Sequence, residues 1–288
     1  MWIAAAVGSA LFAGITAILC KCGLQNTDSD AATALRTSVV LAAAWVVTFV
    51  TGAYRTIGQI DGKSWIFLVL SGIATGGSWI CYFQALQRGE VSKVAAADKS
   101  STVLTVLIAI AVFPEERTNV WLKLCFLAVI AAGTLCMTKT EKTRRGSHPL
   151  WLLFALLSAA FAAASALLAR AGIHNVDSNL ATAIRTSVVT VIAWTLVFTR
   201  KKTPFLRKIN AKEGLFLVLS GIATGASWLC FYYALAAGKV SVVVTVDKLS
   251  ILITVLFSVL FLKETLSLRG WIGLLLLTLG SVCLAVFT

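Results

Sequence analysis

FLVLSGIATG is the sequence from Phe67 to Gly76, and the same letters return unchanged from Phe216 to Gly225. The two copies are 149 residues apart, which is about half the length of the 288-residue chain. The same offset relates the charged segments on either side, namely Arg36-Thr37-Ser38 with Arg185-Thr186-Ser187 and Asp98-Lys99 with Asp247-Lys248. The chain is therefore an internal duplication, and the duplicated unit decides the fold.

The composition is that of a protein built inside a lipid bilayer. Hydrophobic residues make up 59% of the chain, charged residues 13%, and the mean hydropathy is +0.90. Apolar runs long enough to cross a membrane as helices fill nearly the whole sequence. We expect an all-α membrane protein with ten transmembrane helices, at residues 2–20, 31–52, 64–86, 92–113, 118–138, 150–171, 179–199, 213–237, 241–262 and 269–287.

A polar linker at residues 139–149 separates the two copies, so the expected domains are 1–138 and 150–288, each a repeat of five helices. Five is an odd number, and the second repeat must therefore enter the membrane from the opposite side. The sequence predicts two inverted repeats, related by a two-fold axis in the membrane plane.

The net charge of +13 resides mainly in the connecting loops. Loops on one side of the predicted membrane carry 15 Lys and Arg residues, with helix ends included, and the opposite side carries six. The positive-inside rule makes the first side cytoplasmic and directs both termini outward. We expect a multi-pass protein of the cell membrane, of the bacterial inner-membrane type, with membrane lipid as a partner and no nucleic acid. A homodimer is compatible with the sequence.

Arg36 and Arg185 lie one to two turns inside predicted spans, where an arginine costs about 2.5–3.5 kcal/mol on insertion scales. Asp98 and Asp247 lie at similar depth in two other spans. Pairing Arg36 with Asp98, and Arg185 with Asp247, would lower that cost. The alternatives are arginines that extend to the headgroups, and ion pairs that only brace the bundle.

Lys99 and Lys248 follow the aspartates directly and leave a surplus of positive charge in the membrane. This surplus favours an anionic or zwitterionic small-molecule substrate, although both lysines could instead reach an interface. Trp79 and Trp228 lie deeper than the neighbouring aromatic residues and are candidates for a cavity wall. The glycines of the repeated stretch, at an i, i+4 spacing, predict close helix packing. No catalytic or metal-binding motif is present, so neither an enzyme nor a cofactor is expected.

The chain resembles the EamA family of the drug/metabolite transporter superfamily along its whole length. The resemblance is carried by Asp98-Lys99, Asp247-Lys248 and the segment Phe261-Leu262-Lys263-Glu264-Thr265-Leu266, with Phe113-Pro114-Glu115-Glu116-Arg117-Thr118 as its divergent counterpart. It implies ten spans and transport of metabolites, without naming the substrate. The close similarity of the halves looks like a fusion of two copies of a five-span relative.

The expected function is that of a secondary transporter working by alternating access, with a site between the repeats. The expected substrate-binding residues are Arg36, Asp98, Lys99, Arg185, Asp247, Lys248, Trp79 and Trp228. Two alternatives stay open on the sequence: a flippase for a lipid-linked metabolite, and a membrane assembly protein that transports nothing.

Overall fold

The computed structural model describes residues 1–23, 28–88, 91–138, 150–173, 175–206, 209–261 and 267–287, and the chain in these ranges is helical, without a strand. Some side chains inside the helices, those of residues 91–99 among them, also lie outside the description. The first copy forms α1 (Trp2–Gly23), α2 (Ser29–Val50), the 3-10 helix η1 (Ala53–Gln59), α3 (Gly62–Arg88), α4 (Val91–Val112), the 3-10 helix η2 (Pro114–Arg117) and α5 (Val120–Thr138). The second forms α6 (Leu150–Ile173), α7 (Ser178–Thr199), α8 (Thr203–Leu206), α9 (Ala211–Ala237), α10 (Val240–Asp247), α11 (Ser250–Phe261) and α12 (Leu268–Phe287).

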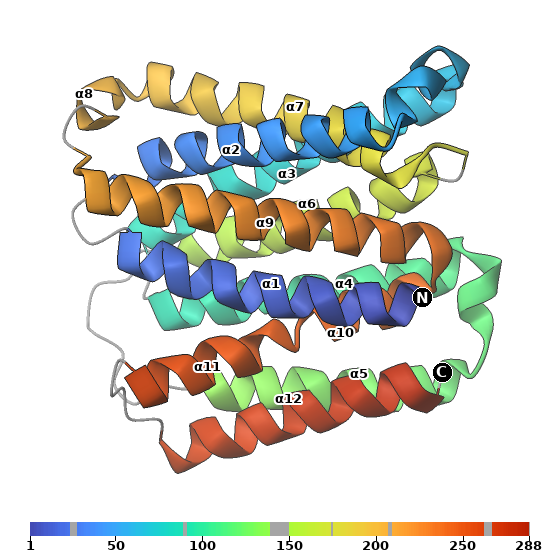
Figure 1. Ribbon diagram of the computed structural model, residues 1–288. Helices are drawn as coiled ribbons and strands as arrows, with labels where there is room; N and C mark the ends of the chain where they lie inside the picture. The colour runs from blue at the N-terminus through green and yellow to red at the C-terminus, as the bar shows by residue number, and fades with distance from the viewer. Residues whose placement is uncertain are drawn as a thin grey trace.

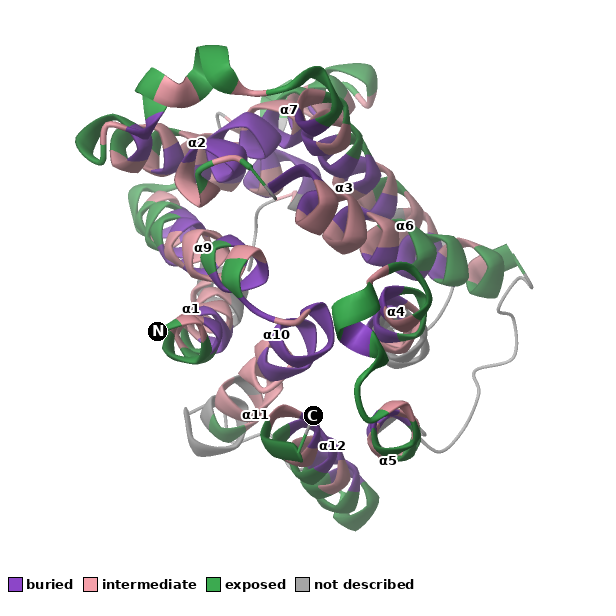
Figure 2. Ribbon diagram, turned by 90° about the vertical axis from the view of Figure 1, so that its right-hand side faces the viewer, coloured by how far each residue is buried: buried purple, intermediate pink, exposed green. Residues whose placement is uncertain are grey.

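The long helices form one bundle, with the N- and C-termini at the same end (Figure 1). Six helices in the described ranges are long and apolar enough to cross a membrane: α2, α3, α6, α7, α9 and α12. Large apolar side chains such as Phe49, Val191 and Leu275 are exposed on the outer faces, and Figure 2 shows the buried stretches turned toward the bundle interior. An apolar exterior of this extent suits contact with lipid.

The ninth predicted span differs from its twin in the first copy. α4 runs unbroken from Val91 to Val112, whereas the corresponding segment divides into α10 and α11 at Lys248 and Leu249. At the break, the amide N–H groups of both residues bond to carbonyls two or three positions back. The all-helical fold is confirmed, and the count of ten spans stays a prediction.

Contacts between the two copies repeat at the sequence offset of 149. Trp45 donates its indole N–H to the Ser187 hydroxyl at 3.2 Å, and Trp194 donates to Ser38 at 2.9 Å. These bonds join α2 and α7, which run antiparallel, because Thr48 near the end of α2 bonds to a carbonyl at the start of α7. A two-fold operation that exchanges two antiparallel helices has its axis perpendicular to them. The bundle therefore has a pseudo-two-fold axis across the helices.

Other helix pairs follow the same operation. The pair α3 and α6 corresponds to the pair α9 and α1, and both are among the most extensive contacts of the bundle, while α5 packs on α12 across the axis. The hydroxyls of Ser78 and Ser158 are 3.1 Å apart, and those of their counterparts Ser227 and Ser9 are 3.3 Å apart. Each of these helix interfaces thus joins one repeat to the other.

The repeated glycines bring the helices of the duplicated stretch against the arginine-bearing helices. A β-carbon on Gly72 would lie 2.8 Å from Cβ of Val188, and one on Gly221 would lie 2.7 Å from Cβ of Val39. Such distances leave no room for a side chain, so the predicted close packing is confirmed. It brings α3 onto α7 and α9 onto α2, with Arg185 and Arg36 beside the contacts.

Candidate functional site

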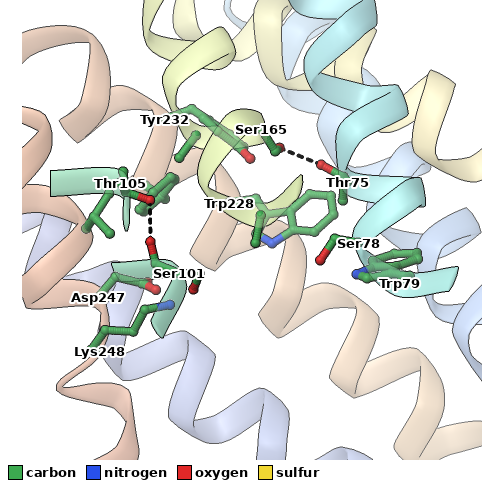
Figure 3. A pocket seen from close by; sticks show the side chains of 14 residues that line it. Thr75, Ser78, Trp79, Ser101, Thr105, Ser165, Trp228, Tyr232, Asp247 and Lys248 are labelled. Atoms are coloured by element: carbon green, nitrogen blue, oxygen red, sulfur yellow. Dashed lines mark hydrogen bonds between the residues drawn. The ribbon is translucent and has the colours of Figure 1, made fainter. Parts of the chain in front are cut away.

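A cavity of about 320 Å³ lies between the two copies, enclosed by α3 and α4 of the first and by α6, α9 and α10 of the second. Its wall combines hydroxyls, aromatic rings and two charged side chains. In Figure 3, Asp247 and Lys248 lie together on one side of the cavity and Trp79 on the other, with Trp228 between them. The polar and aromatic lining includes Thr75, Ser78, Trp79, Trp228, Asp247 and Lys248.

The break between α10 and α11 falls at the two charged residues of the cavity. Asp247 is the last residue of α10, and its carboxylate accepts a hydrogen bond of 2.8 Å from the Ser9 hydroxyl. Lys248 is half-buried in the wall, and in the described part of the chain its ammonium group makes no hydrogen bond or ion pair. A half-buried cation that faces a polar cavity in this way can bind an anionic group.

A second cavity, of about 350 Å³, lies on the other side of the two tryptophans. Arg36 lines it from α2, together with several threonines, and donates a 2.9 Å hydrogen bond to Thr224 of α9. Trp79 and Trp228 line both cavities. The tryptophans therefore stand between two polar spaces that lie at the interface of the repeats.

Arg185, the counterpart of Arg36, is 1% exposed and enclosed by hydroxyl groups. Its Nε donates to Ser71 at 2.8 Å, and its Nη2 donates to Ser165 at 3.0 Å and to Thr75 at 3.2 Å. The guanidinium carbon lies 4.1 Å from the centre of the Tyr232 ring, a cation–π distance. We name Ser71, Thr75 and Ser165 the hydroxyl cage.

The positions equivalent to the cage in the other copy are Ser220, Thr224 and Thr16, near Arg36, but their hydrogen bonds differ. Arg36 bonds to Thr224 within it, while Ser220 donates to the carbonyl of Thr16 and the hydroxyls of Thr16 and Thr224 are 3.4 Å apart. Arg36 is only partly buried and lines the second cavity. Two equivalent arginines of one chain therefore occupy a closed and a more open environment.

The predicted contact between Arg185 and Asp247 is absent, although both side chains are described and lie inside the bundle. Arg185 is held by the hydroxyl cage and Tyr232, and Asp247 by Ser9. Three hydroxyls and a ring face satisfy most of the guanidinium without a carboxylate. The side chains of Asp98 and Lys99 lie outside the described residues, so the pairing of Arg36 with Asp98 stays a prediction.

Nothing in the sequence indicates the cage, because serine and threonine are common in apolar helices and their partners are distant in the chain. Ser71 and Ser165, which bond to each other's carbonyls, are 94 positions apart. Lys123 was also missed. It counts among the loop cations by position, but its ammonium group is fully buried against Glu116 at 2.7 Å.

The all-helical bundle, the apolar exterior and the polar cavities between duplicated halves define a multi-pass membrane protein of transporter type. The model of the EamA-like transporter family matches residues 1–139 and 149–286, and the chain belongs to that family.

Two curated relatives and a solved structure are among the proteins similar to this chain. An uncharacterized transporter of Sinorhizobium sp., from the cobO 3' region, is 43% identical over 137 residues, which is 48% of this chain and 97% of that protein. An uncharacterized protein of Methanocaldococcus jannaschii is 39% identical over 71 residues, which is 25% of this chain and 52% of that protein. A protein crystal structure matches with a TM-score of 0.81 at 15% identity, over 99% of this chain and 97% of that chain, which shows the fold alone.

Proposed function

We propose that this protein is a secondary transporter that moves a small anionic or zwitterionic metabolite across the cell membrane by alternating access. The two repeats are inverted in the membrane, with the axis in the membrane plane, and the termini lie outside. The substrate site is the pair of cavities between the repeats, with Trp79 and Trp228 at its centre.

The observation that carries the proposal is Lys248 in the wall of the central cavity, beside Asp247. In this site Lys248 attracts the anionic group of the substrate, and Asp247 attracts a cationic group if the substrate has one. Arg36 adds a second positive charge across the tryptophans. Cations outnumber anions among the described residues that line the two cavities, which favours an anion or a zwitterion over a cation.

The two arginine environments support alternating access. An inverted repeat can exchange the conformations of its halves, and a chain that is open toward one side shows its two halves in different states. Here Arg185 is enclosed and Arg36 lines a cavity. In the opposite state Arg36 would bond to Ser220 and Thr16 as well as to Thr224, and Arg185 would become accessible.

Ligand binding to the purified protein tests this proposal. A thermal-shift screen would use a panel of carboxylates, phosphate esters, amino acids and cationic amines, since a ligand stabilises the folded state by mass action. We expect anionic or zwitterionic compounds to raise Tm of the parent and to lose that effect in Lys248→Gln. The control is Lys201→Gln, because Lys201 is exposed in a loop and should leave the shift unchanged.

A screen in which only cationic amines stabilise the parent would contradict the assignment. A rise in Tm with anionic compounds that persists in Lys248→Gln would also contradict it.

A further inference from the structure

Glu116 and Lys123 form an ion pair that is completely buried. Asn119, between them in the sequence, bonds to the carbonyl of Phe287, so the pair lies near the C-terminus, at the end of the bundle where both termini lie (Figure 1). The Lys123 ammonium donates to the Glu116 carboxylate at 2.7 Å and to its backbone carbonyl at 2.8 Å. Both side chains are 0% exposed. A buried pair of this kind is weak evidence for stability, because the loss of hydration offsets much of the attraction. The other contacts of the pair point to a different role.

The remaining contacts of the Glu116 carboxylate cross from the first repeat to the second. One oxygen accepts the backbone N–H of Ser241 at 3.0 Å, and the other accepts the Ser241 hydroxyl at 2.5 Å. Ser241 lies in the first turn of α10, where backbone N–H groups have no partner inside the helix. The carboxylate satisfies one of these donors and also suits the positive end of the helix dipole. Lys123 holds the carboxylate in place.

α10 connects this contact to the central cavity. It is eight residues long, begins beside Ser241 and ends at Asp247, after which the helix breaks. Its residues 240–246 are all buried. α10 is therefore a short helix that ends in a break at the cavity and is hydrogen-bonded to the other repeat at the end of the bundle.

We propose that Glu116, Lys123 and Ser241 form a latch that closes this end of the bundle. While Glu116 binds the first turn of α10, this helix covers the cavity from the side of the termini. Release of Ser241 lets α10 rotate about the helix break at Lys248 and Leu249, and the cavity opens to that side. This inference rests on the proposed alternating access, because it assigns the contact that holds one of the two states.

The duplicated sequence does not repeat these residues one for one. Ser92 corresponds to Ser241 at the offset of 149, but Thr265 and Ile272 stand at the positions of Glu116 and Lys123.

Other polar contacts at the same end are exposed and provide controls. Arg170 and Glu115 are 3.3 Å apart with 15% and 44% of their side chains exposed. Lys239 donates to the Thr118 hydroxyl at 3.0 Å. Exposed contacts of this kind contribute little. The latch predicts that removing them leaves α10 in place.

Amide hydrogen exchange on the full-length protein in lipid nanodiscs, without substrate, tests the latch. The variant Glu116→Gln/Lys123→Met removes both charges together and keeps their approximate shapes, so that no buried charge is left alone. We expect the amides of residues 240–247 to exchange at least about tenfold faster than in the parent, with α2 and α7 unchanged. Lys239→Met serves as the matched control and should exchange as the parent does.

A second variant, Ser241→Ala, removes the hydroxyl bond to Glu116 and leaves the ion pair intact. It should accelerate the same amides by a smaller factor. Parental exchange of residues 240–247 in both variants would overturn the latch, and so would a uniform acceleration in all helices, which would mean that the pair braces the whole bundle. The readout needs no ligand, so its failure is distinguishable from a failure of Lys248 to bind substrate.

Discussion

The guanidinium carbon of Arg185 lies 4.1 Å from the centre of the Tyr232 ring. The ring and the hydroxyl cage together hold a charge that is 1% exposed in an apolar bundle. The sequence predicted a carboxylate as the partner of this arginine, and the structure supplies neutral groups instead. A neutral environment is easier to leave and re-form than an ion pair, which suits a residue that changes its exposure during a transport cycle.

Ser71→Ala should destabilise the protein by about 1–3 kcal/mol, because it removes the partner of the buried Arg185 Nε. The repeat supplies the matched control, Ser220→Ala. Ser220 bonds to the carbonyl of Thr16 rather than to an arginine, so its loss should cost less. Thermal unfolding of the two variants in the same detergent measures the difference, and equal losses would show that the cage does not hold Arg185.

Gly76→Ala should destabilise the protein by about 1–3 kcal/mol, because the new methyl group would lie 2.6 Å from Ile192 side-chain atoms. Its counterpart Gly225 faces Ala43 at 3.4 Å, an ordinary contact. Gly225→Ala should be neutral or slightly stabilising, since alanine favours the helix. The comparison uses two glycines in identical sequence, and Tm values that fall equally would contradict the packing described for them.

Asp28 at the start of α2 should make stability depend on pH in the acid range. Burial acts to raise the pKa of Asp28, but the 2.6 Å bond from Lys202 and bonds from two backbone N–H groups outweigh it, so the pKa lies below its ordinary 3.8. A lowered carboxylate pKa contributes stability that is complete above the unfolded value and is lost as pH falls through the folded one.

Asp28→Asn keeps the N-cap and removes this titration. We therefore expect the gap in Tm between the parent and Asp28→Asn to be constant above pH 5 and to narrow as the pH falls below about 4. Circular dichroism melts over this range measure it. A gap that widens on acidification would reverse the sign and refute the contact with Lys202.

The sequence predicted what depends on composition and repetition. The length of the apolar runs predicted the helices, and the offset of 149 relates the contacts between the repeats. Gly72, Gly76 and Gly221 pack closely as expected, whereas Gly225 makes an ordinary contact. Trp79, Trp228, Asp247 and Lys248, which the sequence predicts as site residues, line one cavity.

The features that the sequence did not predict arise from differences between nearly identical halves. Residues 244–252 contain neither glycine nor proline, so nothing in them indicates a helix break, and the twin segment in α4 is continuous. Among the described contacts, Arg185 donates to three hydroxyls and Arg36 donates to Thr224, although hydroxyl residues stand at the same positions in both copies. When each half can adopt two conformations, the duplicated sequence does not indicate which of them each half adopts.

Transport by Lys248→Gln in proteoliposomes is the most direct test of the site between the repeats. The assay follows uptake of a labelled compound from the binding screen, with the thermal stability of each variant measured in parallel. We predict that Lys248→Gln folds normally and loses uptake, that Lys99→Gln behaves in the same way, and that Lys201→Gln transports at the parent rate. Uptake at the parent rate in both Lys248→Gln and Lys99→Gln would contradict the site and the preference for an anionic or zwitterionic substrate.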